Sequence, residues 1–383
     1  MDFDLSEEQR MLQDSVRRLI AERYDFAQRK KYMKEPDGFS RDLWHRYAEM
    51  GLLGLPFEER YGGANGGPIE SMIVMEAFGR GLTLEPYLAT VILSGGLIRL
   101  AGSEAQCAKL LPRIADGSLL AAWAHAEPQS RYDLCDVACT ARRDADGWIL
   151  DGTKSHVIHG DSAGKLIVSA RTGGERRNRD GIALFLVDAD APGVQRRGYP
   201  TQDGLRAAQI KLSDVRVASR DALGEPGKAA PVIERVADGA LAALAAEAVG
   251  AMAAAHETTV EYLKTRKQFG VTIGSFQVLQ HRAVDMLVEL EQARSMALLA
   301  AMMADEPDAT ERRKAISAAT VQVRNSGRSI GQQAVQLHGG IGMTLEYKIG
   351  HYFKRFTAME TLFGDTDHHL AALAAAGGLI APA

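Results

Sequence analysis

The sequence predicts an α+β protein in which an antiparallel β-domain separates two helical domains. Apolar residues recur at spacings of three and four in the first and last thirds of the chain, as in amphipathic helices. Short alternating runs bounded by turn residues fill the middle. The 383 residues, 46% of them hydrophobic, are enough for two or three domains with a large core. We expect an N-terminal helical domain over residues 1–120, a central β-domain over 121–225 and a C-terminal helical domain over 226–383.

The first domain is expected to contain only helices and loops. Ser6 can cap the first helix, whose apolar residues follow a helical stripe. Pro86 suits the first turn of a later helix. Glycines and Pro56 make the stretch before residue 68 a loop. The expected helices cover residues 4–27, 43–50, 68–81, 85–101 and 104–111.

The central domain is expected to be a small antiparallel sheet, because its apolar runs are short, alternating and closely spaced. Turn signals lie at Asp146-Gly147, Asp151-Gly152 and Gly173-Gly174. The strand-like segments cover residues 136–144, 146–160, 165–172, 181–189 and 207–217.

The C-terminal helices are long, rich in alanine and interrupted at Gly270, at residues 305–308 and at Gly339-Gly340. A basic turn joins the first two of them. Arg266 and Phe269 precede Gly270, a good helix stop, and a short loop leads to Gln277, just before the next helix. Arginine can pair with phosphate and an aromatic side chain can stack on a ring, so this turn is a candidate anion site. A solvated basic helix end is the alternative interpretation of the same residues.

Composition excludes several classes of function. The net charge of −4 leaves no basic excess for nucleic acid. Cys107, Cys135 and Cys139 lack metal-ligand spacing and indicate incidental thiols in a reducing compartment. His368 and His369 face different directions on a helix without an evident third ligand, so no metal site is expected. The acidic N-terminus is unlike a signal peptide, and no apolar run approaches the roughly 20 residues of a transmembrane helix. We therefore expect a cytoplasmic protein that binds neither nucleic acid nor a membrane.

Several phrases along the chain resemble signatures of the acyl-CoA dehydrogenase family. In chain order they are LLPRIADGSLLAAWAHAEP, DGWILDGTKSHVIHG, RKQFG, FQ with LQH, and HGGIGMTLEYKI. No phrase is specific by itself, but their order and spacing over about 370 residues match the family. The resemblance implies the acyl-CoA dehydrogenase fold, which also runs from helical to β to helical domains.

The resemblance also implies a chemistry. Members remove an α-proton and a β-hydride from an acyl-CoA thioester, FAD accepts the hydride, and an electron-transfer flavoprotein reoxidises the flavin. They form dimers or tetramers in which the nucleotide half of FAD contacts a neighbouring subunit. Close approach to a pyrophosphate is a physical reason for two adjacent glycines, although a plain helix–helix turn would also use them. The residues implied as FAD ligands are Arg266, Phe269, Gln277, Gln336, Gly339 and Gly340.

The positions that would hold the flavin ring depart from the family pattern. Members usually read Thr-Glu-Pro and then Gly-Ser-Asp where this chain has Ala126-Glu127-Pro128 and Arg131-Tyr132-Asp133. Their Trp-Ile-Thr-Asn is replaced by His156-Val157-Ile158-His159. The family's Thr hydroxyl bonds the reactive edge of the flavin, and Ile158 has no group that can do so.

The catalytic base of the family is missing from both places where members carry it. Many members carry a Glu in a Tyr-Glu-Gly-Thr motif, which counting places at Phe363, or at Gly364 after a slip of one residue. Others carry the base on the helix before RKxFG, where this chain has Ala240-Leu241. Asp365 is the best candidate for a relocated base, and the alternative is that it caps the last helix.

Four hypotheses of function follow. The chain is one subunit of a heteromeric acyl-CoA dehydrogenase whose homologous partner supplies the base; its LFGDTDHH ending resembles the base-lacking subunits of members that act on steroid side chains or dicarboxylic acyl-CoAs. Alternatively, it is a self-sufficient homomeric enzyme that uses Asp365. A third hypothesis is a non-catalytic scaffold that binds acyl-CoA or FAD, and a fourth is a flavin-dependent oxidase or monooxygenase on the same fold. A retained Arg266 and Phe269 favour the first hypothesis over the third, since a scaffold has no use for flavin-facing side chains.

Overall fold

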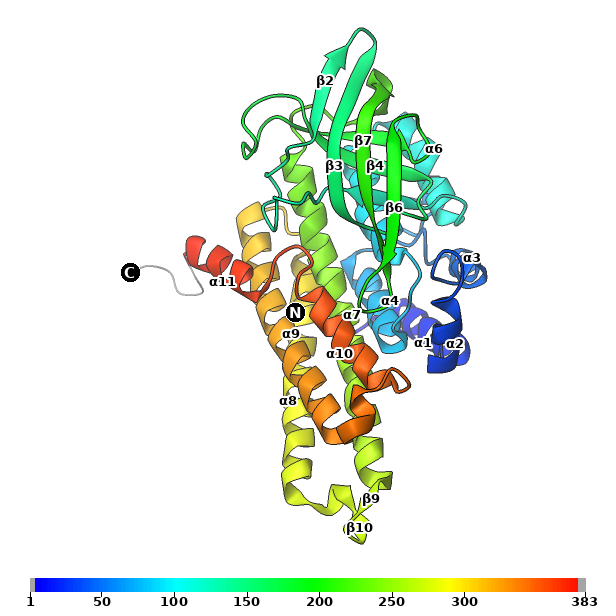
Figure 1. The fold of residues 1–383 in the computed structure, drawn as a ribbon, viewed down its shortest axis with the longest axis vertical. Coiled ribbons are helices and arrows are strands. Elements are labelled where there is room, and N and C mark those ends of the chain that lie inside the picture. The colour runs from blue at the N-terminus through cyan, green and yellow to red at the C-terminus, as the bar shows by residue number, and fades with distance from the viewer. Residues whose placement is uncertain (1–3, 378–383) are drawn as a thin grey trace. The chain divides into compact units, whose positions relative to one another are not determined.

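Two structural units each draw on separate stretches of the chain in a computed structural model that describes residues 4–377 (Figure 1). The helical unit comprises Met1–Lys31, Pro68–Thr83 and Leu241–Ala383. The mixed unit comprises Tyr32–Gly67 and Leu84–Ala240. The first 120 residues are therefore divided between the two units, and the sheet belongs to the mixed unit together with the helices nearest to it in sequence.

The helical unit begins with α1 (Glu7–Arg23), whose capping box between Ser6 and Gln9 confirms the predicted cap. The single helix predicted over residues 4–27 is two helices, because the side chain of Asp25 accepts from the backbone of Gln28 and starts α2 (Phe26–Tyr32). The other helices of this unit are α4 (Pro68–Gly81), the C-terminal part of α7 (Ala230–Thr265), α8 (Gln277–Met303), α9 (Ala309–His338), α10 (Lys348–Met359) and α11 (Thr366–Ala375).

Helices α4 and α7 cross in backbone contact, and glycine makes this possible. A Cβ added at Gly79 would lie 1.8 Å from the carbonyl oxygen of Glu247, and one added at Gly250 would lie 1.8 Å from that of Glu76. Any side chain at either position would push the helices apart. The crossing therefore fixes α4 against the middle of the alanine-rich α7.

Helix α7 is the most apolar long helix among the described residues. It contains a window apolar and long enough to cross a membrane, contrary to the expectation that no run would qualify, but 94% of that window is buried inside the protein. Burial of this kind is typical of a core helix. The predicted breaks after α7, after α8 and after α9 are confirmed by the helix ends at Thr265, Met303 and His338.

The mixed unit is built around one sheet with the strand order β6-β7-β3-β2-β4-β5-β8, and β1 pairs with β4. Most neighbours are antiparallel, as predicted, but β1 runs parallel to β4 and a single bridge joins β2 to β4 in parallel. The strands are β1 (Ala121–Ala124), β2 (Thr140–Asp144), β3 (Gly147–Ile158), β4 (Lys165–Arg171), β5 (Ile182–Asp188), β6 (Val194–Pro200), β7 (Arg206–Ala218) and β8 (Ala222–Leu223).

Two details of the sheet differ from the sequence prediction. The turn predicted at Asp151-Gly152 is wrong, because β3 continues through it and only its register against β7 shifts there. Gly152 has φ +151°, and an added Cβ would lie 2.8 Å from the Cα of Cys139, so this glycine serves a bulge. Strand β6 was missed because most of its side chains are exposed and polar.

Apart from η3 (Ser219–Asp221) and the start of α7, the helices of the mixed unit precede the sheet in sequence. The helix predicted over residues 85–101 is a π-helical stretch that continues into a short α-helix. These elements are α3 (Arg41–Glu49), the short η1 (Glu59–Tyr61), the π-helical η2 (Leu88–Gly95), α5 (Gly96–Ala101) and α6 (Glu104–Ala115).

Candidate functional site

The basic turn after α7 is a tight hairpin made of β9 (Lys267–Gln268) and β10 (Val271–Thr272). Its two central residues both have positive φ, 55° for Phe269 and 83° for Gly270. Glycine adopts this conformation freely, whereas a bulky residue does not. The side chain of Phe269 is nevertheless 89% exposed, with only an edge contact to Phe276. The hairpin therefore holds an apolar ring in a strained position without burying it in its own chain.

The late glycine motif lies at the same end of the helical unit (Figure 1). His338 ends α9 and stacks on Tyr262 of α7, with ring centroids 4.4 Å apart. Gly339 has φ +63°, so its glycine is explained by backbone conformation. Gly340 has no such conformation, and a Cβ added to it would meet nothing within 4 Å in this chain. A requirement for glycine at 340 would therefore have to come from outside the chain.

All of the residues implied as FAD ligands are exposed in the structure. Tyr262 stacks on His338 and so brings the end of α7 close to the end of α9. The implied FAD ligands lie in the segments around these two helix ends. A nucleotide fits this arrangement, since exposed guanidinium, amide, ring and glycine backbone groups are the usual ligands of a phosphate-bearing cofactor. The exposed residues are Arg266, Phe269, Gln277, Gln336, Gly339 and Gly340.

The segments expected to face the flavin ring belong to the mixed unit and contain a buried ion pair. Lys154 of β3 donates from Nζ to Oε1 of Glu127 at 2.7 Å, and the exposed fractions of the two side chains are 0% and 2%. The backbone nitrogens of Ala138 and Cys139 donate to the two oxygens of the same carboxylate. Burial by itself would raise the pKa of Glu127, but Lys154, together with the hydrogen bonds from Gln129 and the backbone of Cys139, lowers that pKa below its ordinary value. The pair thus ties the Ala126-Glu127-Pro128 segment to β3.

A histidine extends this network. Lys154 also donates to the carbonyl of His125 and to the hydroxyl of Ser169. Nδ1 of His125 lies 2.8 Å from that hydroxyl, and its ring stacks on Trp123. Burial, and then the charge of Lys154, lower the pKa of His125 to about 3, so its imidazole is neutral at physiological pH. No role was predicted for Lys154, although it lies within the phrase DGWILDGTKSHVIHG, in the polar part of β3.

The flavin-edge position is apolar, as the sequence indicated. Ile158 ends β3 and is partly buried. Nδ1 of His156 lies 3.1 Å from the hydroxyl of Tyr199, which donates to the carbonyl of Ser155. These side chains bond within the sheet, so none of them takes the place of the family's Thr.

The two locations considered for the base lie beside one apolar cluster. Phe363, at the position counted as the family's Glu, packs against a cluster that includes Leu241, the second residue of the Ala240-Leu241 pair counted for the other location. Phe363 also has φ +59°, which is unusual for an aromatic residue. The sequence treated these locations as separate possibilities, and the structure places Phe363 and Leu241 in one helical core. The other members of the cluster are Ala242, Ala300, Ala304, Ile316 and Ala319, with Met296 at its edge.

The next residue offers no room for a base either. A Cβ added at Gly364 would lie 2.5 Å from Cδ2 of His368 and 2.8 Å from Nε2 of His369. Arg324 of α9 holds this loop by donating to the carbonyls of Leu362 and Gly364. The loop at the family's base position is therefore fixed by one buried arginine and filled by two imidazoles.

The acidic residues of this region have other partners. Asp365 is the N-cap of α11 and accepts from the backbone nitrogen of His368 at 2.8 Å, which is the capping role considered in the sequence analysis. Glu247 is buried in a two-pronged pair with Arg355, at 2.7 and 2.8 Å. Glu360 accepts from Arg328 and from the backbone and hydroxyl of Thr366. A role for Asp365 as a base stays a prediction.

Histidines and cysteines form no metal site in residues 4–377. No group of three or more His, Cys, Asp or Glu side chains in this range is arranged to hold a metal ion. Cys107, Cys135 and Cys139 are free thiols. His369 is fully buried and bonds through Nδ1 to the hydroxyl of Ser317.

Comparison with known proteins gives consistent matches over the chain. Models of the N-terminal, middle and C-terminal domains of acyl-CoA dehydrogenase match residues 6–118, 122–216 and 232–378. A probable acyl-CoA dehydrogenase, YngJ of Bacillus subtilis, is 30% identical over 365 residues, covering 94% of this chain and 95% of that protein. The caffeyl-CoA reductase-Etf complex subunit CarC of Acetobacterium woodii is 29% identical over 328 residues, 84% of this chain and 86% of CarC. A solved variant of the Tcur3481-Tcur3483 steroid ACAD superposes with a TM-score of 0.87 at 31% identity, covering 97% of each chain.

Proposed function

Because this chain belongs to the acyl-CoA dehydrogenase family of FAD-dependent flavoenzymes, we propose that it is one subunit of a heteromeric acyl-CoA dehydrogenase. The reaction is the α,β-desaturation of an acyl-CoA thioester. A homologous partner subunit supplies the base, and this chain contributes part of the FAD site.

One observation carries the proposal. Neither location at which family members carry the base has a side chain that can take a proton, because Phe363 stands at one and Ala240-Leu241 at the other. Both locations are apolar: Phe363 packs against the core cluster that contains Leu241, and Ala240 is fully buried. The nucleotide-facing groups, by contrast, are all exposed, and Phe269 is held exposed in a strained conformation. A chain that has lost one half of a site and keeps the other fits a shared site.

The flavin, when bound, supplies the acceptor for the hydride leaving the β-carbon. This chain's own residues bind and orient it. Arg266 carries the positive charge suited to the pyrophosphate, the ring of Phe269 offers a stacking surface, and the backbone at Gly339 and Gly340 allows close approach of a phosphate. The α-proton is taken by a carboxylate of the partner, which must lie in a dry pocket to act near neutral pH.

The comparisons support the assembly without defining it. The steroid ACAD of similar structure carries a two-component name, and CarC is named as a subunit of an Etf complex. We therefore propose electron-transfer flavoprotein as the electron acceptor and a dimer or tetramer as the working state. Exposed apolar side chains on α8, including Val284, Leu287 and Val288, are available for such an assembly.

The second candidate is a self-sufficient homomeric enzyme with Asp365 as the base. Its supporting observation is that Asp365 directly follows Gly364 in the loop where the family's base lies. A scaffold without redox chemistry is less favoured, because it gives no reason for a strained, exposed Phe269.

The deciding experiment measures flavin content and acyl-CoA-dependent flavin reduction of this chain, alone and coexpressed with a homologue that carries the Glu. We expect the chain alone to be colourless, and the pair to be yellow and active. Stoichiometric FAD that bleaches with acyl-CoA in this chain alone would refute the subunit proposal.

Arg266→Ala in the pair should lower flavin content while both subunits stay folded. Lys264→Ala is the matched control, because Lys264 is an exposed cation two residues earlier and pairs only at the surface with Glu261. Equal flavin content in the two variants would remove Arg266 from the site.

A further inference from the structure

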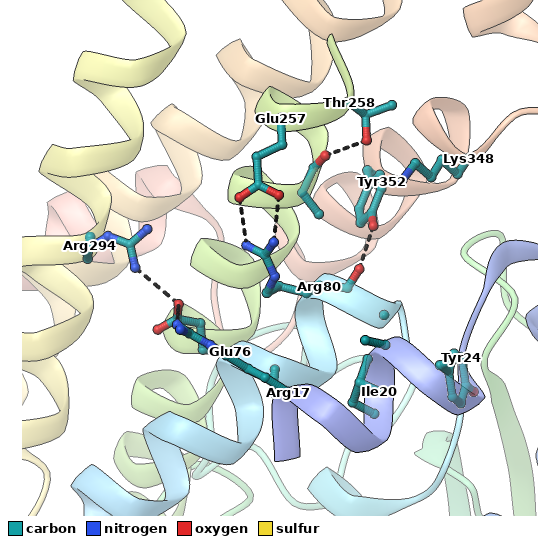
Figure 2. Close-up of a pocket in the computed structure, with 14 residues that line it drawn as sticks. Arg17, Ile20, Tyr24, Glu76, Arg80, Glu257, Thr258, Arg294, Lys348 and Tyr352 are labelled. Atoms are coloured by element: carbon teal, nitrogen blue, oxygen red, sulfur yellow. Dashed lines mark hydrogen bonds and ion pairs between the residues drawn. The ribbon is translucent and has the colours of Figure 1, made fainter. Parts of the chain in front are cut away.

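A cavity in the helical unit contains an amine that the flavin chemistry does not use. The cavity lies among α1, α4, α7, α8 and α10, has a volume of about 580 Å³, and opens to solvent on one side (Figure 2). Cavities that hold small organic ligands measure about 300–1,000 Å³, so this one is large enough for a short acyl chain. Its lining belongs entirely to the helical unit.

The amine belongs to Lys348, the first residue of α10, which is half-buried in the cavity wall. The N-terminal end of a helix carries a partial positive charge, so an ammonium group is disfavoured there. No carboxylate in residues 4–377 lies within ion-pair distance of this amine, and Figure 2 shows it beside Tyr352 with no bond drawn to it. The position therefore favours the neutral form of the amine over the charged form.

The charged neighbours of Lys348 do not compensate it. Glu257 of α7 accepts through both oxygens from Arg80 of α4, at 3.1 and 2.6 Å, so this pair adds almost no net charge. The hydroxyl of Tyr352 donates to the carbonyl of Arg80 at 2.5 Å. Burial lowers the pKa of Lys348; Glu257 opposes this shift and Arg80 adds to it. A larger share of this amine is therefore neutral, and so nucleophilic, than in an exposed lysine.

The cavity wall opposite α10 is apolar. Ile20 of α1 and the adjoining ring of Tyr24 line the cavity across from Lys348 (Figure 2). Ala254 of α7 also lines it. An acyl chain that lies against these side chains removes apolar surface from water, which favours its entry into the cavity.

We propose that Lys348 is a site of covalent acylation by acyl-CoA thioesters. The neutral amine attacks the thioester carbonyl, the C–N bond of an amide forms, and the C–S bond breaks. CoA leaves as the thiolate and takes up the proton that the nitrogen loses, so the reaction needs no oxidant or reductant. A desolvated lysine beside another cation is a nucleophile of this kind. The product is an uncharged amide, which removes the unpaired charge from the start of α10. The inference rests on the proposed function only for the class of acyl donor.

The test incubates the full-length chain, as purified, with butyryl-CoA and follows the occupancy of each lysine by mass spectrometry of its peptides. We expect Lys348 to be butyrylated at least about fivefold faster than Lys354, which lies on the same helix outside the cavity lining. In the urea-unfolded chain the two rates should become similar, because burial and the apolar wall are then lost.

A matched pair of variants tests the role of charge. Thr258 lines the same cavity, so Thr258→Glu adds a carboxylate that can pair with the ammonium form of Lys348. It should slow butyrylation of Lys348 at least about threefold. Thr258→Gln is the control, because its side chain has a similar size and no charge, and it should keep the original rate. Lys354 serves as the internal reference in both variants, and circular dichroism checks that both are folded.

Three results would overturn the proposal. The first is equal butyrylation of Lys348 and Lys354 in the folded chain. The second is a preference for Lys348 that persists in urea, which would assign it to the local sequence instead of the cavity. The third is equal slowing by Thr258→Glu and Thr258→Gln, which would show that the charge state of the amine does not control the reaction. The measurement needs neither flavin nor a partner subunit, so its failure would leave the subunit proposal untouched.

Discussion

Replacing Lys154 by Met is expected to destabilise the mixed unit by about 3–5 kcal/mol, the usual consequence of removing one partner from a buried ion pair. The ammonium group makes three contacts, to Glu127, to the carbonyl of His125 and to Ser169. Met fills a similar volume, so the loss is electrostatic rather than a cavity. The carboxylate of Glu127 would remain buried with only backbone and amide donors.

The loss can be followed by urea denaturation, with the fluorescence of Trp123 and Trp148 in the same sheet as the signal. Lys165→Met is the matched control, since its pair with the mostly exposed Asp188 should contribute no more than about 1 kcal/mol. The double variant Lys154→Met/Glu127→Gln should recover part of the stability, because no charge is then left buried. Equal denaturation midpoints for Lys154→Met and Lys165→Met would refute the reasoning.

Three further predictions follow from the site. Phe269→Gly should relieve backbone strain of about 1 kcal/mol and leave this chain at least as heat-stable as the wild type. The same variant should lower the flavin absorbance of the assembled enzyme. Unchanged flavin absorbance would show that Phe269 is not part of the cofactor site. Asp365→Asn should keep both the helix cap and turnover, since Asn also caps helices; a fall in kcat of roughly 100-fold or more would instead make Asp365 the base. Burial lowers the pKa values of His125 and His369 to about 3. Below about pH 6.5 the unfolded chain therefore binds more protons than the folded chain. As the pH is lowered from that value, the free energy of unfolding should decrease by up to about 1.4 kcal/mol per pH unit for each histidine. Urea midpoints between pH 7 and 5 measure this fall, and a His369→Gln variant with the same pH slope would contradict the assignment to His369.

The sequence by itself determined the order of helical and β segments, the cap at Ser6, most helix breaks and the family. These features depend on local periodicity, capping residues and motifs, all of which are readable along the chain. It also supplied the residues predicted as FAD ligands, because an RKxFG turn needs no distant contact to be recognised. The exposed strand β6 and the bulge at Gly152 were missed, since the first lacks an apolar pattern and the second depends on contact with Cys139 of another strand.

Only the tertiary structure decided how distant residues meet. Phe363 and Leu241 are more than a hundred residues apart, and they meet in one apolar core beside both locations considered for the base. Lys154 and Glu127 form an ion pair because the segment that contains Glu127 lies against β3. Such long-range packing sets burial and ion pairing, which no local pattern in a single sequence encodes.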